Sequence, residues 1–158
     1  MKNDKLTQLL KTHHTDAFRW ASQCCNYQHE DAEEVLQTSY LKIASGKARF
    51  NERSTFKTWL FAVIRNTARD YLDKQVRFEQ LDPLSQTPAE AISEDRANYR
   101  ALLARLPGRQ QQVLLLVFYH GMTLQQVAET TNLHVGTVRT HYSRGKASLR
   151  VLIEKEKV

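Results

Sequence analysis

The sequence predicts an all-α protein with two small helical domains joined by a flexible linker, the C-terminal domain being a helix-turn-helix. Apolar residues recur at intervals of three and four over long stretches, as on the buried face of a helix. Strand signals are weak, because the chain has only five glycines and lacks the Asn-Gly dipeptide of tight hairpins. The stretch 76–97 contains two prolines without sustained apolar periodicity, so it is the predicted linker between domains at 1–75 and 98–158.

Composition limits the class of protein. With 41% hydrophobic and 25% charged residues, the chain of 158 residues resembles a globular protein, which excludes wholesale disorder and membrane spans. Its first ten residues lack the long apolar run of a signal peptide. The two cysteines, Cys24 and Cys25, are adjacent, so no disulfide framework is expected. We therefore expect a reduced, cytoplasmic protein.

Two helices are predicted in the N-terminal domain. The longer one covers 54–74, and its inward face consists of Phe56, Trp59, Leu60, Val63, Ile64, Ala68, Tyr71 and Leu72. The shorter one covers 34–43, and its inward residues are Val35, Leu36, Tyr40 and Ile43. Four acids at or just before its start, Glu30, Asp31, Glu33 and Glu34, suit the positive N-terminal end of that helix.

The C-terminal domain carries the signature of a helix-turn-helix. One helix is predicted to begin at Pro107 and to stop at Gly121. Thr123 and Gln126 then form a capping-box pattern that starts a short helix, which Asn132 ends in the left-handed conformation of a tight turn, with Leu133 filling the junction. A second helix from about residue 136 has its packed side on Val138, Tyr142, Gly145 and Leu149.

The opposite side of that last helix is basic and made of small polar residues, with His141 on the far flank. No acid follows Glu129 until Glu154, so the charge collects where a recognition helix would meet a polyanion. Arginine can read guanine edges in a major groove, and lysine or serine can bind phosphates. The predicted DNA-binding residues are Arg139, Thr140, Ser143, Arg144 and Lys146.

The long N-terminal helix carries a second basic ridge. Its basic and aromatic members follow one another at four-residue steps, with an amide and an acid beside them. Such a ridge suits unpaired or opening DNA. The predicted residues are Lys57, Phe61, Arg65, Asn66, Arg69 and Asp70.

Two runs of sequence now identify a family resemblance. The run "DAEEVLQTSYLKI", then Phe50, then "STFKTWLFAVIRNTARDYL", closely resembles the second conserved region of bacterial RNA polymerase sigma factors of the extracytoplasmic-function (ECF) subgroup. The run "LLARLPGRQQQVLLLVFYHGMTLQQVAETTNLHVGTVRTHYSRGKASL" resembles their fourth region. The resemblance leaves out the first two dozen residues, the linker and the tail.

The resemblance implies a promoter-specific transcription initiation factor that binds core RNA polymerase and is not an enzyme. The long N-terminal helix would open the downstream promoter element, with Asn66 near a flipped base, and the last helix would face the upstream element. The helix at Pro107 would hold the flap of the polymerase's second-largest subunit, and the linker would thread toward the RNA exit path. An anti-sigma factor is the expected regulator, and neither a cofactor nor a metal is implied. The residues expected to bind the clamp of the largest subunit are Glu34, Gln37, Thr38 and Lys42, with Thr38 at a position where relatives often carry a carboxylate.

Three other interpretations of the residues stay open at this point. A stand-alone helix-turn-helix regulator would bind duplex DNA tightly without polymerase. An interaction module would use the acidic helix to sequester another protein. A helical hydrolase or metal enzyme would need a site among His13, His14, Cys24 and His29, although no nucleophile, base and orienting residue occur together.

Overall fold

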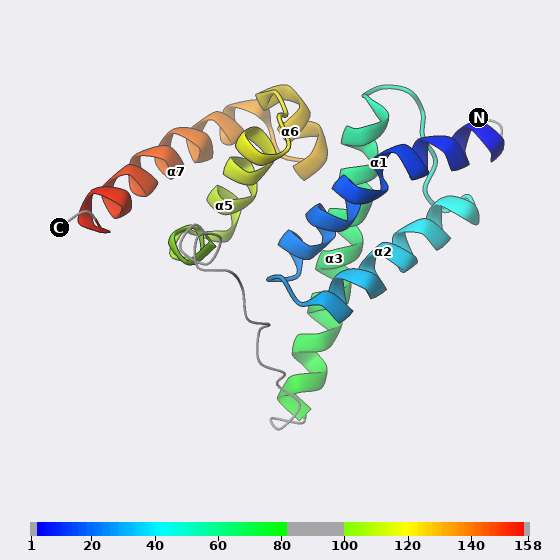
Figure 1. Ribbon diagram of the computed structural model, residues 1–158, viewed down its shortest axis with the longest axis horizontal. Coiled ribbons are helices and arrows are strands. Elements are labelled where there is room, and N and C mark those ends of the chain that lie inside the picture. The colour runs from blue at the N-terminus through cyan, green and yellow to red at the C-terminus, as the bar shows by residue number, and fades with distance from the viewer. Residues whose placement is uncertain (1–2, 82–99, 157–158) are drawn as a thin grey trace. The chain divides into compact units, whose positions relative to one another are not determined.

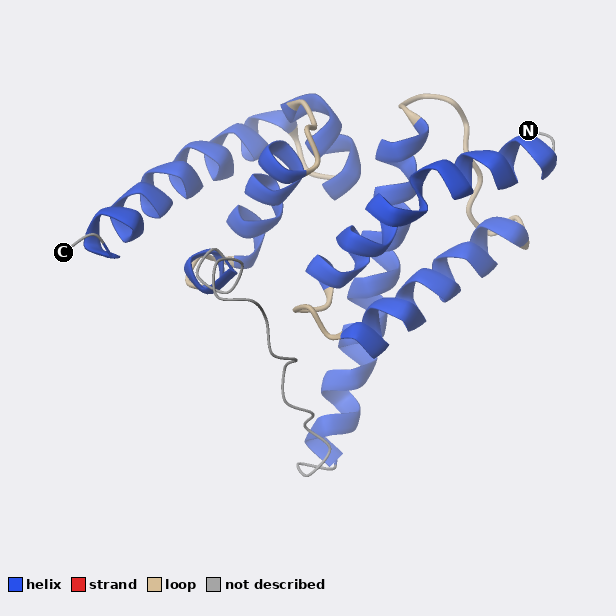
Figure 2. Cartoon of the chain, viewed as in Figure 1, coloured by secondary structure: helices blue, strands red, loops and turns tan. Residues whose placement is uncertain are grey.

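The computed structural model describes residues 3–81 and 100–156, which belong to two compact units along the chain (Figure 1). Every regular element in these two ranges is a helix, and none is a strand (Figure 2). The predicted all-α class is therefore confirmed. No helix within the described ranges has the length and apolar character needed to cross a membrane.

The N-terminal unit is a bundle of three helices, α1 (Asn3–Cys24), α2 (His29–Ala44) and α3 (Phe56–Leu81). Each of the three helices packs against the other two (Figure 1). The sequence pattern predicts α2 and α3, although it starts α2 five residues too late, and it does not predict α1. Helix α3 continues through 76–81, which the prediction assigns to the linker, whereas 82–97 lie outside the described residues.

Helix α1 explains why the buried face of α3 is wider than predicted. Leu60, Ile64 and Ala68 are buried as expected, and Phe61 is buried as well. Trp20 of α1 covers Phe61, with the two rings stacked at a centroid distance of 5.7 Å. A helix that contacts two neighbours buries a broader face than one that contacts a single neighbour.

The described part of the C-terminal unit includes helical residues 100–104 and continues with α5 (Gly108–Leu114), which Pro107 precedes as N-cap. The helix then changes to a π-helical turn, η1 (Leu115–Tyr119), in which the His120 amide donates to the Leu115 carbonyl oxygen at 3.1 Å. Gly121, with φ +68°, stops the helix as predicted. The π turn is not predicted, and in the wider turn Leu116 is buried while Phe118 and Tyr119 are exposed.

The helix-turn-helix forms as predicted from α6 (Leu124–Thr131) and α7 (Val135–Glu156). The capping box is complete: the Gln126 amide donates to Thr123 Oγ1 at 3.1 Å, and the Thr123 amide donates to Gln126 Oε1 at 3.0 Å. Asn132 is left-handed at φ 56°, and the Leu133 amide closes the turn on the Ala128 carbonyl oxygen at 3.2 Å. These contacts set the angle at which α7 leaves α6.

Candidate nucleic-acid interface

Helix α7 exposes the face that the sequence assigns to DNA. Its inward side is fixed by Val138 and Gly145, which are both buried, and a Cβ at Gly145 would lie only 3.2 Å from Leu114 Cδ1. Because α5 and α7 approach this closely, the opposite side of α7 has a fixed direction. The exposed residues there are Arg139, Thr140, Ser143, Arg144 and Lys146.

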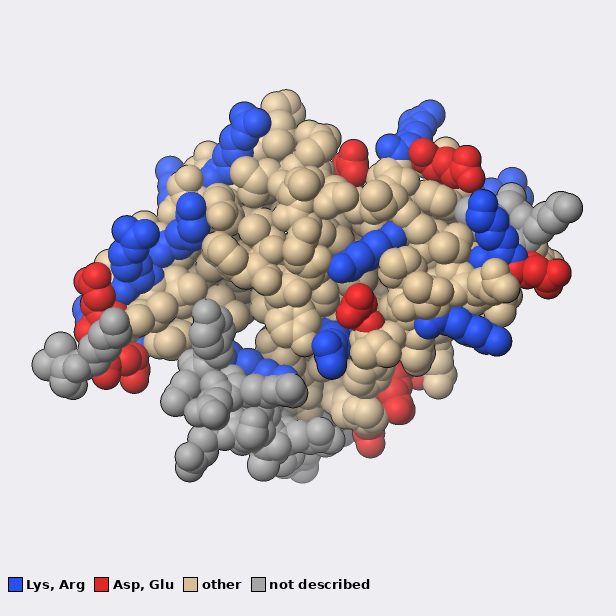
Figure 3. All heavy atoms as spheres, turned by 45° about the horizontal axis from the view of Figure 1, so that its top comes forward, with Lys and Arg blue, Asp and Glu red and all other residues tan. Residues whose placement is uncertain are grey.

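The charge on α7 has one sign until its last turns. No acidic side chain precedes Glu154 in the helix, and Figure 3 shows Lys and Arg gathered along its surface, with acids near its C-terminal end. The Thr140 hydroxyl donates to the Gly136 carbonyl oxygen at 3.1 Å, so it keeps an acceptor lone pair toward solvent. Cations and hydroxyl groups of this kind can bind phosphates and base edges in a major groove.

Two side chains of α7 differ from the other members of this face. The ammonium group of Lys146 lies over the Tyr142 ring at 4.1 Å from the ring centroid, so this side chain leans toward the packed side of the helix. His141 is half-buried, and its Nδ1 is enclosed by protein. His141 and Lys146 therefore lie on opposite flanks of the predicted DNA-binding face, as the helix geometry predicts.

Helix α3 presents part of the predicted second ridge. Asn66, Arg69 and Asp70 are exposed, and Arg65 is half-buried beside them. The amine of Lys57, also half-buried, lies 5.5 Å from the centroid of the Phe61 ring.

The prediction was wrong about Phe61, whose side chain has no exposed area. Helix α1, absent from the prediction, supplies Trp20 to cover it. Phe61 is thus a core residue that supports the ridge from below.

Helix α2 carries the residues expected to bind polymerase. Glu34 and Gln37 are exposed and Thr38 is half-buried, so these three share one surface. Leu41 lies on the same surface one turn later and is 68% exposed, which makes it an apolar neighbour that the prediction did not include.

Lys42 was expected to share that surface, but its side chain points toward α3 instead. Its ammonium group donates to Thr67 Oγ1 of α3 at 2.9 Å in a partly buried contact. The Thr67 hydroxyl in turn donates to the Val63 carbonyl oxygen at 2.8 Å. Lys42 therefore links α2 to α3 and holds the two exposed helix faces in a constant relation to each other.

A second polar link joins these helices near the start of α2. Tyr71 donates its hydroxyl hydrogen to Asp31 Oδ1 at 2.8 Å, and the Gln75 amide donates to the same oxygen at 3.3 Å. Burial, together with the hydrogen bond to Asp31, raises the pKa of Tyr71 well above its ordinary value. Tyr71 therefore stays protonated and keeps this hydrogen bond across the physiological pH range.

The loop between α2 and α3 adds cations that the sequence analysis did not include. Lys47, Arg49 and Arg53 are all exposed on this loop. Phe50 anchors it, because its ring lies 5.5 Å from the Phe56 ring and 5.4 Å from the Trp59 ring. The signal that could have found these cations is their clustering directly before α3, the helix that carries the basic ridge.

The histidines and cysteines suggested for a metal site have separate surroundings. His13 lies against Phe56, His14 Nδ1 is 2.8 Å from the Tyr40 hydroxyl, and His29 pairs with Glu33 at 2.9 Å. Within 3–81 and 100–156, no group of three His, Cys, Asp or Glu side chains is arranged to hold a metal ion.

The two thiols are poor nucleophiles in the folded chain. Burial and the neighbouring Cys25 raise the pKa of Cys24 well above its ordinary value, and burial raises the pKa of Cys25 to about 12. The thiolate, which is the reactive form, is therefore scarce at neutral pH. Cysteine chemistry gains no support from these surroundings.

Comparison with known proteins identifies both units. The chain matches the family model for Sigma-70 region 2 over residues 9–78 and that for Sigma-70, region 4 over residues 96–149. The region 2 match begins within α1, so the family likeness extends further toward the N-terminus than the quoted runs suggest.

Two relatives match over most of the chain. The chain is 27% identical over 154 residues to RNA polymerase sigma factor SigV of Bacillus subtilis. This alignment covers 96% of the chain and 92% of SigV. It is also 27% identical over 128 residues to ECF RNA polymerase sigma factor EcfG of Rhodopseudomonas palustris, covering 77% of this chain and 71% of EcfG.

Solved structures share the fold. Sigma factor RpoE of Bartonella quintana, in complex with the anti-sigma factor NepR, aligns with a TM-score of 0.79 at 22% identity, over 95% of this chain and 97% of that one. CnrH, in complex with the cytosolic domain of CnrY, aligns with a TM-score of 0.73 at 22% identity, over 98% of this chain and 90% of that one. The chain therefore belongs to the sigma-70 family of RNA polymerase sigma factors, in its ECF subgroup.

Proposed function

We propose that this sigma factor binds core RNA polymerase through α2 and its C-terminal unit, and directs promoter-specific initiation through α3 and α7. The observation that carries this role is the exposed basic face of α7, held outward by the close packing at Gly145. The chain makes and breaks no bond itself, and it acts where the polymerase acts, in the cytoplasm.

The upstream promoter element is read by the first half of α7. In helix-turn-helix proteins, the N-terminal part of the recognition helix reaches the base edges. Arg139, Thr140, Ser143 and Arg144 occupy that part and are exposed. The arginines are suited to guanine edges, and the hydroxyl groups to phosphates or other base edges.

The downstream element is opened at α3. Arg69 and the half-buried Lys57 and Arg65 supply positive charge along the helix, and Asn66 and Asp70 supply polar groups for an unpaired base. Holding one base out of the stack costs a few kcal/mol, which stacking and hydrogen bonds partly recover. Phe61 has no part in this contact, because it is buried.

Binding to polymerase lets the two weak DNA contacts act together at one promoter. Glu34, Gln37 and Thr38 on α2 contact the clamp of the largest subunit, and Lys42 positions that helix from behind through Thr67. The α5–η1 helix engages the flap. Tethering both DNA-binding units to one polymerase raises their effective concentration at a promoter. The chain without polymerase therefore binds DNA weakly and with strong salt dependence.

An anti-sigma factor controls the chain by covering its two units. The structural neighbour RpoE was solved with the anti-sigma factor NepR, which supports this kind of regulation. Purification of the chain from its native cells without induction should recover such a partner. Repeated recovery of polymerase alone would place control in expression instead.

In vitro transcription from a fragmented genomic library tests the main role. Purified core polymerase is used with and without the chain, and the transcript starts are sequenced. Starts that occur only with the chain and share two upstream motifs are the expected result. The absence of new starts, together with tight duplex binding without polymerase, would indicate a stand-alone regulator.

A further inference from the structure

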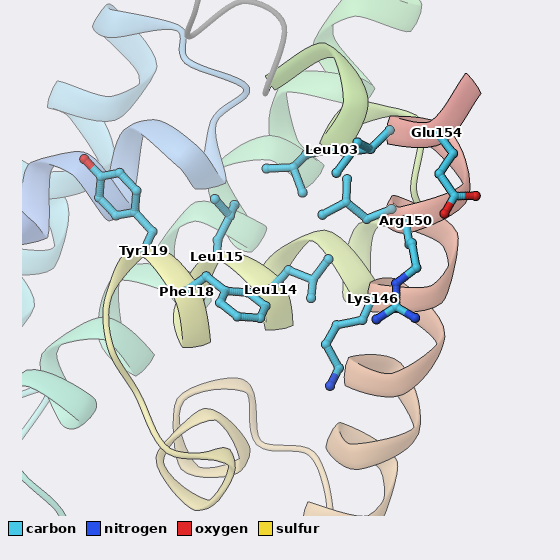
Figure 4. A pocket seen from close by; sticks show the side chains of 10 residues that line it. Leu103, Leu114, Leu115, Phe118, Tyr119, Lys146, Arg150 and Glu154 are labelled. Carbon is cyan, nitrogen blue, oxygen red and sulfur yellow. The ribbon is translucent and has the colours of Figure 1, made fainter. Parts of the chain in front are cut away.

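The contacts between neighbouring helices differ in kind between the two units. Helix α7 and the α5–η1 helix face each other across apolar side chains, among them Leu103, Leu114 and Leu149 (Figure 4). Between α2 and α3, side-chain hydrogen bonds add to the packing, and the donor of one of them is a cation, Lys42. Apolar packing has no preferred direction, whereas a hydrogen bond needs its donor and acceptor to be aligned. The polar links therefore define more narrowly how α2 and α3 are placed.

The link from Lys42 ends at the backbone of α3. Lys42 Nζ donates to Thr67 Oγ1 at 2.9 Å, and Thr67 Oγ1 donates to the Val63 carbonyl oxygen at 2.8 Å. Because the one hydroxyl hydrogen of Thr67 is used within α3, the contact with Lys42 uses a lone pair. Thr67 is 2% exposed, which leaves little access for water. Successive hydrogen bonds of this kind polarise and strengthen one another.

The bond between Lys42 and Thr67 lies between the two surfaces proposed to bind polymerase and DNA. Lys42 follows Thr38, a residue of the polymerase-binding surface, by about one helical turn. Thr67 directly follows Asn66, which is exposed about 100° around α3 from it. A shift of Thr67 relative to Lys42 would therefore move Asn66 relative to the surface that binds polymerase.

The charge of Lys42 contributes little to stability at this position. Its contact with Thr67 is partly buried. Moving an ammonium group out of water has a cost, which one hydrogen bond to a neutral hydroxyl group offsets only in part. Polar groups kept in such surroundings can specify one arrangement of the elements around them. The bond is therefore better explained by the placement of α3 than by the stability of the bundle.

We propose that Lys42 is a positioning residue for promoter opening, an assignment that rests on the sigma-factor function proposed above. When the exposed face of α2 is bound to polymerase, the bond from Lys42 to Thr67 holds the middle of α3 so that Asn66 and Arg69 meet the strand that opens. Lys42 touches neither polymerase nor DNA in this role. Its loss should therefore slow the opening of the downstream element without weakening polymerase binding.

Two lysine variants with the same change of charge test this role. Lys42→Met keeps an apolar stem and removes the ammonium group, and Lys11→Met removes an exposed ammonium group from α1. Permanganate reactivity of unpaired thymines follows opening of a promoter found by the transcription experiment above. We expect Lys42→Met to slow opening about tenfold, the effect of one hydrogen bond to a charged group, and Lys11→Met to leave the rate unchanged. Lys42→Arg keeps a cation with N–H donors and should retain much of the rate.

A promoter that is already open separates positioning from a general structural defect. Mismatched bases keep its downstream element unpaired, so the opening step is bypassed. Lys42→Met should initiate from this promoter at nearly the rate of the unmodified chain. Competition with a labelled copy of the unmodified chain should also show an unchanged affinity for core polymerase. A variant that had lost part of its fold would fail in both measurements.

Thr67→Val removes the same bond from the other side. This variant should slow opening at least as much as Lys42→Met, because it also loses the bond to the Val63 carbonyl oxygen. The double variant should be no slower than Thr67→Val alone, since the bond to Lys42 can be lost only once. Urea unfolding followed by circular dichroism should confirm that each variant is folded under the assay conditions.

Four results would overturn the assignment: opening by Lys42→Met as fast as by Lys11→Met, a loss of polymerase affinity that accounts for the slower opening, the same defect on the promoter that is already open, or a double variant slower than both single variants. In each case the unmodified chain still supports transcription, so only the role of Lys42 fails. If the unmodified chain supports no transcription, the sigma-factor function itself fails, and the role of Lys42 fails with it.

Discussion

The indole ring of Trp20 lies parallel to the Phe61 ring, with 3° between the ring planes, and its Nε1 donates a hydrogen bond to the Phe61 carbonyl oxygen at 3.1 Å. Both side chains are fully buried. Through this contact α1 determines how α3 is rotated, and hence which residues of α3 face solvent. A helix without any proposed DNA or polymerase contact thereby sets the direction of Asn66 and Arg69.

Loss of this contact should destabilise the N-terminal unit. We expect Trp20→Ala to lower the free energy of unfolding by about 3–5 kcal/mol, because it leaves a large cavity beside Phe61. Trp20→Phe retains a ring and loses the hydrogen bond, so it should lose less. Urea unfolding followed by circular dichroism measures both. Equal stability of Trp20→Ala and the unmodified chain would show that this contact does not hold α1 to α3.

A second prediction concerns Asn132, the left-handed residue of the helix-turn-helix. Asn132 has φ 56°, where a side chain with Cβ costs about 1–2 kcal/mol and glycine costs nothing. We expect Asn132→Ala to destabilise the C-terminal unit by about 1 kcal/mol, and Asn132→Gly to be at least as stable as Asn132→Ala. Thermal unfolding compares the two variants. If glycine were the worse residue, the Asn132 side chain would have a role beyond its backbone conformation.

Local signals explain which parts of the fold could be predicted. The capping box and the turn at Asn132 depend on residues three to five positions apart, so a short stretch of sequence contains the whole interaction. The π turn at Leu115–Tyr119 leaves no such local pattern, because the run of apolar residues there fits a regular helix equally well.

Contacts between distant helices explain the errors in the candidate site. Phe61 follows Lys57 at a spacing that suits an exposed ridge, and only Trp20, 41 residues earlier in the sequence, shows why it is buried. Lys42 likewise lies on the amphipathic helix α2, and only its bond to Thr67 reveals that it faces α3. Periodicity assigns a residue to a side of a helix, but it does not say which sides have neighbours.

Because the pKa of Cys25 is raised, the free energy of unfolding should fall as the solution becomes alkaline. Burial raises this pKa from an ordinary value of 9.0 to about 12, so the folded chain holds this proton more tightly than the unfolded chain. The stabilisation is fully present below the ordinary pKa of 9.0 and is lost as the pH rises from there toward 12. Unfolding free energies measured from pH 8 to pH 11 should fall less steeply for Cys25→Ala than for the unmodified chain. Parallel slopes would mean that Cys25 does not ionise on unfolding.

Two adjacent glutamates of α2 provide a matched test of polymerase binding. Glu34 lies near the middle of the surface that carries Gln37, Thr38 and Leu41, whereas Glu33 lies at the edge of that surface, about 100° around the helix from Glu34, and pairs with His29. Glu34→Lys and Glu33→Lys change the charge equally at almost the same distance from the helix N-terminus, so any effect on the helix itself should be similar. We expect Glu34→Lys, in the middle of this surface, to weaken core polymerase binding about tenfold and Glu33→Lys, at its edge, to weaken binding less, as measured by competition with a labelled copy of the unmodified chain. Equal losses would assign the effect to the overall charge of α2, and a loss confined to Glu33→Lys would move the contact to the neighbouring surface of the helix.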